Sequence, residues 1–271
     1  MDPKRATIRL IGLPTDSHSS FLRGAAAAPA AIRAALESDH ANMAAECGLE
    51  LGSDIAVEDT GDLQLDEGAG DFDRIRDYAA ASVTDGTVPI FLGGDHMVTN
   101  PIVAGIVAVR GPVNILHFDA HPDLYEDFEG DPLSHASPFA RIMERGDAAR
   151  LVQVGIRTSN HHCREQAKKF GVETVEMRDF SLDRVPIPDA PLYISIDMDA
   201  LDPAFAPGVS HHEPGGLSVR DILSVLRRIR SPIIGADVVE YNPSRDINGV
   251  TAVVAAKLVK EIAAIAAGGT E

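Results

Sequence analysis

Aspartate and histidine side chains gather directly after three apolar stretches of this sequence. In extended backbone, residues two positions apart point to the same side, so the side chains within each group can converge on one point. Packing so many carboxylates at the ends of buried strands would be costly without positive charge nearby. The spacing therefore predicts a site for divalent metal ions. The three groups are Gly93-Gly94-Asp95-His96, Asp119-Ala120-His121-Pro122-Asp123 and Asp197-Met198-Asp199.

The number and chemistry of these ligands indicate two ions rather than one. Six protein ligands are too many for one ion that must also hold a reactive water, whereas two ions roughly 3.5–4 Å apart can share bridging carboxylates. Carboxylate-rich sites suit Mg, Ca or Mn, and imidazoles shift the preference toward transition metals. We therefore predict two Mn²⁺ per subunit and leave cobalt or iron open. The predicted ligands are His96, Asp119, His121, Asp123, Asp197 and Asp199.

The elements that must position these ligands are short runs of Val, Ile and Leu separated by helical patterns. Fully apolar strands that alternate with helices indicate an α/β fold, with a mostly parallel sheet covered on both faces. Ligands of such sheets bind beyond the carboxyl ends of the strands. No linker or repeat divides the chain, so we expect one domain over residues 1–271. The predicted strands are 7–13, 88–92, 113–118, 150–155, 192–196 and 232–239, and the predicted helices are 29–36, a helix from about 100 with Pro101 first, and 249–267.

Composition and charge narrow the class of partner. The chain has 271 residues and a formal net charge of −17, without a long run of Lys or Arg, so we expect no nucleic-acid partner. The two cysteines, Cys47 and Cys163, suggest reduced thiols in a cytosolic protein. The first residues carry no apolar signal region, and the apolar runs are far shorter than the ~20 residues that span a membrane. These features predict a cytoplasmic protein with no membrane partner.

The motifs resemble those of the ureohydrolase family, which comprises arginase, agmatinase and their relatives. The resemblance runs nearly end to end, and the plant-type arginase branch is the most similar. That branch shares Glu129-Gly130 and Ser134-His135-Ala136-Ser137 in the loop after the second group. The other matching segments are Gly93-Gly94-Asp95-His96, Phe118-Asp119-Ala120-His121-Pro122-Asp123, Ser195 to Pro203, Ser19-Ser20-Phe21-Leu22-Arg23-Gly24, Ala206 to Ser210, Glu213-Pro214-Gly215-Gly216 and Gly235 to Pro243.

The resemblance implies a three-layer α/β/α sandwich in a single ureohydrolase domain, usually assembled as a homo-trimer or homo-hexamer. It also assigns roles to the metal ligands. Asp119 and Asp197 would bridge the two ions. One coordination sphere would be completed by His96 and Asp123, and the other by His121 and Asp199.

Two further roles follow from the resemblance. His135 corresponds to the proton-shuttle histidine of the family, and Glu240 corresponds to the carboxylate that pairs with the substrate guanidinium. Asp95 is expected to orient a neighbouring group, and Asp202 is expected to be a turn residue.

The implied substrate is a small cationic guanidino compound. Plant-type likeness favours L-arginine, cleaved to urea and ornithine, ahead of agmatine, and other guanidino acids and formiminoglutamate stay open. We expect the acidic loop 124–134 to face the far end of the substrate, where it could disfavour a carboxylate, although Asn160 or Arg157 could bind one. Two rivals are a single-zinc hydrolase of the related deacetylase fold and a catalytically silent metal-binding regulatory protein. The second would be expected to have lost ligands or Glu240, and all are present.

Overall fold

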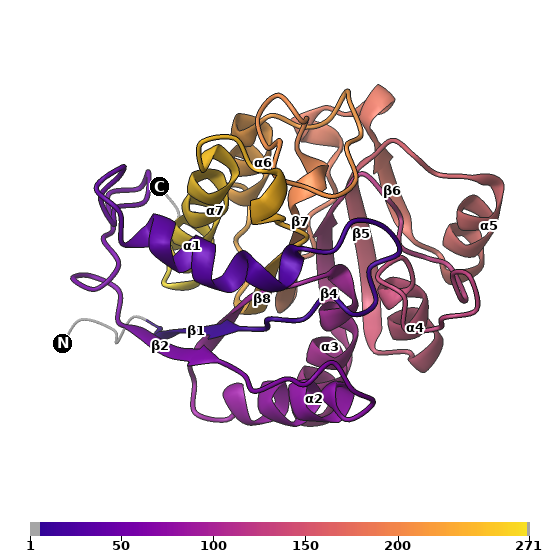
Figure 1. Ribbon diagram of the computed structural model, residues 1–271, viewed down its shortest axis with the longest axis horizontal. Coiled ribbons are helices and arrows are strands. Elements are labelled where there is room, and N and C mark those ends of the chain that lie inside the picture. The colour runs from indigo at the N-terminus through magenta and orange to yellow at the C-terminus, as the bar shows by residue number, and fades with distance from the viewer. Residues whose placement is uncertain (1–5, 270–271) are drawn as a thin grey trace.

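A single eight-stranded sheet forms the centre of the molecule (Figure 1). The computed structural model describes residues 6–269. The strand order is β2-β1-β3-β8-β7-β4-β5-β6, and every pairing between neighbours is parallel. The strands are β1 Ile8–Gly12, β2 Val57–Asp62, β3 Val88–Leu92, β4 Val113–Phe118, β5 Ala148–Ile156, β6 Glu173–Glu176, β7 Leu192–Asp197 and β8 Ile233–Val239.

Helices cover both faces of this sheet. On one face α1 and α6 pack against α7, and on the other α2, α3, α4 and α5 follow one another in contact. The predicted α/β/α sandwich with a parallel sheet is therefore confirmed. The helices are α1 Ala28–Leu36, α2 Asp71–Ser82, α3 Thr99–Arg110, α4 Pro138–Arg145, α5 His161–Phe170, α6 Val219–Leu226 and α7 Val250–Ala266.

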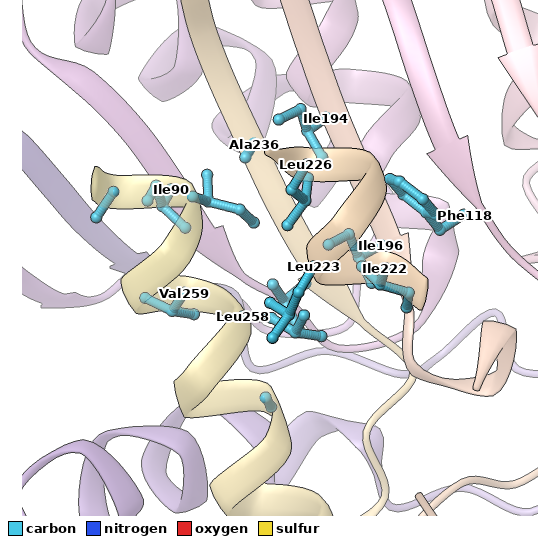
Figure 2. Packing of buried hydrophobic residues seen from close by; sticks show 14 of the residues in the cluster. Ile90, Phe118, Ile194, Ile196, Ile222, Leu223, Leu226, Ala236, Leu258 and Val259 are labelled. Atoms are coloured by element: carbon cyan, nitrogen blue, oxygen red, sulfur yellow. The ribbon is translucent and has the colours of Figure 1, made fainter. Parts of the chain in front are cut away.

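Two hydrophobic cores separate these layers. Successive side chains of a strand point to opposite faces, so Ile90 and Leu92 of β3 join the core under α1, α6 and α7, while Phe91 joins the other. Figure 2 shows Leu223 of α6 and Leu258 of α7 among the side chains of the first core. Each fully buried aliphatic side chain contributes about 1.5–3 kcal/mol relative to exposure. Burial on both faces of the sheet explains why the central strands are mostly apolar.

The ends of the predicted strands lie within two residues of the observed ones. The edge strands β2 and β6 and the helices α2, α4, α5 and α6 were not predicted. β2 is an edge strand of exposed, mostly polar residues, so it lacks the apolar signature. The prediction that Pro101 opens its helix is wrong, because α3 begins at Thr99 and follows a 3₁₀ turn over His96–Val98. Between β6 and β7, the segment 181–191 is a loop with one 3₁₀ turn, at Leu182–Arg184. Within residues 6–269, no helix combines the length and apolarity needed to cross a membrane.

Candidate metal centre and active site

The carboxyl ends of three central strands bring the six predicted ligands together. β3, β7 and β4 are followed by the three groups, and only β8 lies between β3 and β7. The Nδ1 atom of His96 faces three carboxylate oxygens, at 3.3 Å in Asp119, 3.1 Å in Asp123 and 3.2 Å in Asp197. These four side chains are buried. They form one half of a polar centre at this edge of the sheet.

The second half of the centre surrounds His121. Its Nδ1 atom lies 3.0 Å from Oδ2 of Asp199 and 3.4 Å from Oδ1 of Asp119. Asp119 therefore faces both imidazoles, one with each of its oxygens. A carboxylate in that position is placed to be shared between two cations.

Backbone N–H groups hold the carboxylates in place. Asp119 accepts from the N–H of His121 at 2.6 Å, and Asp197 accepts from the N–H of Asp199 at 2.7 Å. Each side chain thus binds the amide two residues ahead of it, a local turn to which aspartate is suited. Asp199 in turn accepts from the N–H of Ala120 at 3.1 Å, which ties the end of β7 to the end of β4.

The electrostatics of the centre fit a divalent cation. The buried Nδ1 atom of His96 has no hydrogen-bond partner among the described residues, although three carboxylates surround it. Burial, together with the charges of Asp199 and Asp119, raises the pKa of Asp197 well above its usual range. Burial opposes the charged form of His96, yet the negative charges of the nearby Asp119, Asp123 and Asp197 carboxylates raise its pKa well above 6.5. Without a metal the centre is short of positive charge, and its oxygen and imidazole donors suit Mn²⁺ or a similar ion.

His117 supports the centre and was missed by the sequence reasoning. Its Nε2 lies 2.8 Å from Oδ2 of Asp119, and Nε2 of Gln153 donates to its Nδ1 at 3.1 Å. Since Nδ1 accepts, Nε2 carries the proton and donates to Asp119. The ring also stacks on Phe139, with 3.9 Å between centroids. His117 lies two residues before Asp119, so its side chain points to the same side of the chain. This spacing could have identified it from the sequence.

Glu240 and His135 form an ion pair beside the metal centre. Oε1 of Glu240 accepts from Nδ1 of His135 and from the N–H of His96, both at 2.8 Å. Burial opposes both charges. The charge of Glu240 nevertheless raises the pKa of His135 to about 9, and that of His135 lowers the pKa of Glu240 below 4.5. At neutral pH both groups are therefore charged.

Two of the five non-glycine residues with positive φ within residues 6–269 belong to this site. Glu240 and Asp123 both adopt a left-handed conformation, with φ of 62° and 51°. Such conformations cost of order 1–3 kcal/mol and persist where the surrounding structure holds them. Glu240 is held by its own N–H, which donates to the carbonyl of Gly94 at 2.9 Å. A Cβ on Gly94 would lie 1.6 Å from the carbonyl oxygen of Thr15, so glycine is required there.

The loop after β1 approaches this pair from a distant part of the sequence. As expected for a supporting residue, Asp95 accepts a hydrogen bond, from the N–H of His18 at 3.0 Å. The carbonyl of His18 then accepts from the N–H of His135 at 3.1 Å. Ser20 in the same loop reaches Nε2 of His135 with its hydroxyl, at 2.8 Å. Neither His18 nor Ser20 was given a role by the sequence reasoning, because only the folded loop brings them here.

A cavity of about 190 Å³ opens beside the metal centre. It is smaller than the ≈ 300–1,000 Å³ of typical drug-sized sites, which favours a small metabolite. Its lining includes Tyr125 and Phe128 from the loop after β4, and Asn160 and Cys163 at the start of α5. The remaining lining residues are Ser20, His121, Pro122, Asp123, His135, Ala136, Thr158, Asp197, Asp199, His211 and Glu240.

The acids of loop 124–134 do not line this cavity, contrary to expectation. Glu126 pairs with Lys169 at 3.2 Å, and Asp131 pairs with His18 at 2.7 Å. Arg157 is not a lining residue either, because its guanidinium donates to backbone carbonyls that include that of Glu213. Of the two residues proposed to bind a carboxylate, only Asn160 is in place.

His211 is a further lining residue that the sequence reasoning missed. Its ring centroid lies 5.4 Å from that of His135 and 5.8 Å from that of His121. Burial lowers its pKa, and the nearby His135 adds to that effect. A neutral imidazole here avoids repelling a cationic ligand. Asp202, by contrast, is the turn residue expected, since it accepts from the N–H groups of Ala204 and Gly215.

A parallel sheet with a carboxylate–imidazole centre at its carboxyl edge defines the class of this protein. The sequence profile of the Arginase family matches residues 6–264, and the chain belongs to that family. It is 50% identical over 277 residues to "Arginase, mitochondrial" of Medicago truncatula, covering 96% of this chain and 82% of that protein. It is also 50% identical over 278 residues to "Arginase 1, mitochondrial" of Arabidopsis thaliana, covering 96% of this chain and 81% of that protein. The solved structure of the Medicago truncatula arginase superimposes with a TM-score of 0.87 at 48% identity, covering 97% of this chain and 88% of that one. The resemblance to ureohydrolases, and to their plant-type branch, is thus confirmed.

Proposed function

We propose that this chain hydrolyses the guanidino group of L-arginine and releases urea and ornithine. The convergence of two imidazoles and four aspartates beside Glu240, in a cavity of metabolite size, carries this proposal. The names of the relatives that share half of its residues support arginine over agmatine as the substrate.

The metal ligands are proposed to divide as the two halves of the centre suggest. His96 and Asp123 would hold one ion, His121 and Asp199 the other, and Asp119 with Asp197 would be shared. Manganese is the proposed metal at both positions because the donors are mostly carboxylates. When bound, such ions would lower the pKa of water and polarise the substrate.

Glu240 and His135 have distinct proposed tasks. The buried carboxylate of Glu240 would pair with the substrate guanidinium and hold its carbon in position, which is catalysis by orientation. A guanidinium carbon is a poor electrophile, because its charge is spread over three nitrogens, so positioning matters. His135, charged at neutral pH, would give a proton to the departing amine nitrogen. A cytoplasmic location and a trimeric or hexameric assembly stay predictions.

Urea release from L-arginine and agmatine tests the substrate. We expect protein incubated with manganese to prefer arginine, because Asn160 and Tyr125 line the cavity and the acids of loop 124–134 do not. A colorimetric urea assay at equal substrate concentrations, with metal content measured in parallel, decides this. Preference for agmatine would contradict the substrate, and urea from neither would contradict the reaction. A single bound ion would contradict the proposed pair of manganese ions.

The ion pair predicts how His135→Asn behaves. Turnover should fall while metal content stays intact, because His135 is hydrogen-bonded to Glu240 and Ser20 and not to a predicted metal-ligand side chain. A raised pKa contributes stability that is fully present below 6.5 and is lost as pH rises through about 9. The difference in Tm between metal-free wild type and variant should therefore be largest below pH 6.5.

Calorimetry across pH 5.5–10 measures that difference. His161→Asn, which changes an exposed histidine, is the matched control and should show no such trend. A difference that grows toward alkaline pH would refute the ion pair, and loss of metal would remove His135 from the shuttle role.

A further inference from the structure

We propose that Ser20 relays protons between bulk water and the buried imidazole of His135, an inference that rests on the proposed function. The Ser20 hydroxyl oxygen lies 2.8 Å from Nε2 of His135. His135 is only 8% exposed, whereas Ser20 is exposed and also lines the cavity. Ser20 thus connects a buried proton donor to the solvent.

The need for such a connection follows from the task of His135. A histidine that gives a proton to the departing amine must regain one in every turnover. Its Nδ1 side is closed by Glu240, which is itself buried at 4% exposure and would be occupied by substrate. On the Nε2 side, Ser20 provides the one hydrogen-bonded side chain within residues 6–269.

The two polar groups of Ser20 differ in what they allow at Nε2. The backbone N–H donates to Nε2 at 3.1 Å, which requires a lone pair there and places the ring proton of a neutral His135 on Nδ1. Once Nε2 is protonated, it can no longer accept a hydrogen bond from this N–H. The hydroxyl can then rotate and accept, because it is both a donor and an acceptor. It is therefore the group that suits both states of the ring.

The relay step balances with a solvent acid as its proton source. Hydronium or a protonated buffer molecule transfers a proton to the hydroxyl oxygen of Ser20. At the same time the original hydroxyl proton moves to Nε2 of His135. The products are an unchanged serine, an imidazolium and the conjugate base of the solvent acid.

The loop that carries Ser20 is fixed on both sides of it. Asp16 accepts from two backbone N–H groups further along the same loop, at 2.6 and 3.2 Å. His18 is held between Asp95 and the backbone of His135. In Figure 1 this indigo segment, between β1 and α1, extends well beyond the end of β1 before it turns back to the helix. The hydroxyl is thereby kept within reach of the ring.

Steady-state kinetics of three loop variants test the relay. Ser20→Ala removes the hydroxyl and keeps the backbone N–H, Ser20→Thr restores a hydroxyl, and Ser17→Ala is the matched control in the same loop. In dilute buffer we expect kcat of Ser20→Ala to fall about tenfold or more, toward the 10²–10⁴ that an acid–base group contributes. KM and metal content should stay unchanged. Imidazole buffer should restore much of the loss, and Ser20→Thr and Ser17→Ala should turn over within about twofold of wild type.

Two results would overturn the relay. The first is wild-type turnover of Ser20→Ala in dilute buffer, and the second is a loss that neither imidazole nor Ser20→Thr restores. Failure of the proposed function would look different, since wild-type protein would then release no urea from arginine at any buffer concentration.

Discussion

Asp119→Ala should abolish turnover by removing metal from the protein. Asp119 is buried and faces His96 with one oxygen and His121 with the other, so one substitution weakens both halves of the centre. Loss of an outer hydrogen-bond partner of a metal ligand costs about 10- to 100-fold in affinity or activity. Loss of a shared ligand should exceed that range. Metal analysis after gel filtration and a urea assay measure both effects.

Two further variants separate metal loss from misfolding. Asp119→Asn keeps the shape of the side chain and removes its charge, so it should stay folded by circular dichroism and still lose metal. Asp147→Ala removes another buried aspartate, which lies just before β5 and pairs with Arg145 at the end of α4. This variant should keep its metal. Two bound ions and near-normal turnover in Asp119→Ala would show that the metal site is assigned to the wrong residues.

Glu240→Gln should lower kcat/KM strongly while the metal stays bound. The substitution keeps the shape of the side chain and removes the charge proposed to pair with the guanidinium. Removing one partner of a buried, hydrogen-bonded charge pair costs about 2–5 kcal/mol. At ~1.4 kcal/mol per tenfold change, this amounts to a loss of roughly 30-fold or more.

The same experiment needs a control for net charge. Glu126→Gln removes one negative charge from the loop after β4, where Glu126 pairs with Lys169 at the surface. It should leave kcat/KM within about twofold of wild type. An unchanged kcat/KM in Glu240→Gln, or a loss matched by Glu126→Gln, would remove Glu240 from the guanidinium site.

Local patterns were sufficient to predict the central strands and the metal centre. Strands buried on both faces are mostly apolar, so β3, β4 and β7 stand out from their residues alone. The alternate spacing of aspartate and histidine then reports the side to which each side chain points. Since parallel strands end at one edge of the sheet, these separate motifs had to meet there.

Edge strands and amphipathic helices left weaker signals. Both β2 and β6 lie at the edges of the sheet, where partial exposure admits polar residues. α5 is a mostly polar helix whose start is fixed by the side chain of Asn160, which accepts from the N–H of Cys163. Such elements are stabilised by capping and by contacts with neighbours more than by an apolar pattern.

The surroundings of His135 and Glu240 were decided by tertiary structure alone. Ser20 and His135 are 115 residues apart in the sequence, and His211 comes from a loop that follows β7. Neither spacing nor composition reports a contact between loops, because its geometry depends on how each loop leaves the sheet. The spacing of aspartate and histidine predicted which residues could bind metal, and the family resemblance predicted that Glu240 pairs with a guanidinium. The fold determined which groups support the predicted ligands and which acids of loop 124–134 lie outside the cavity. It also placed the hydroxyl of Ser20 beside the buried imidazole of His135.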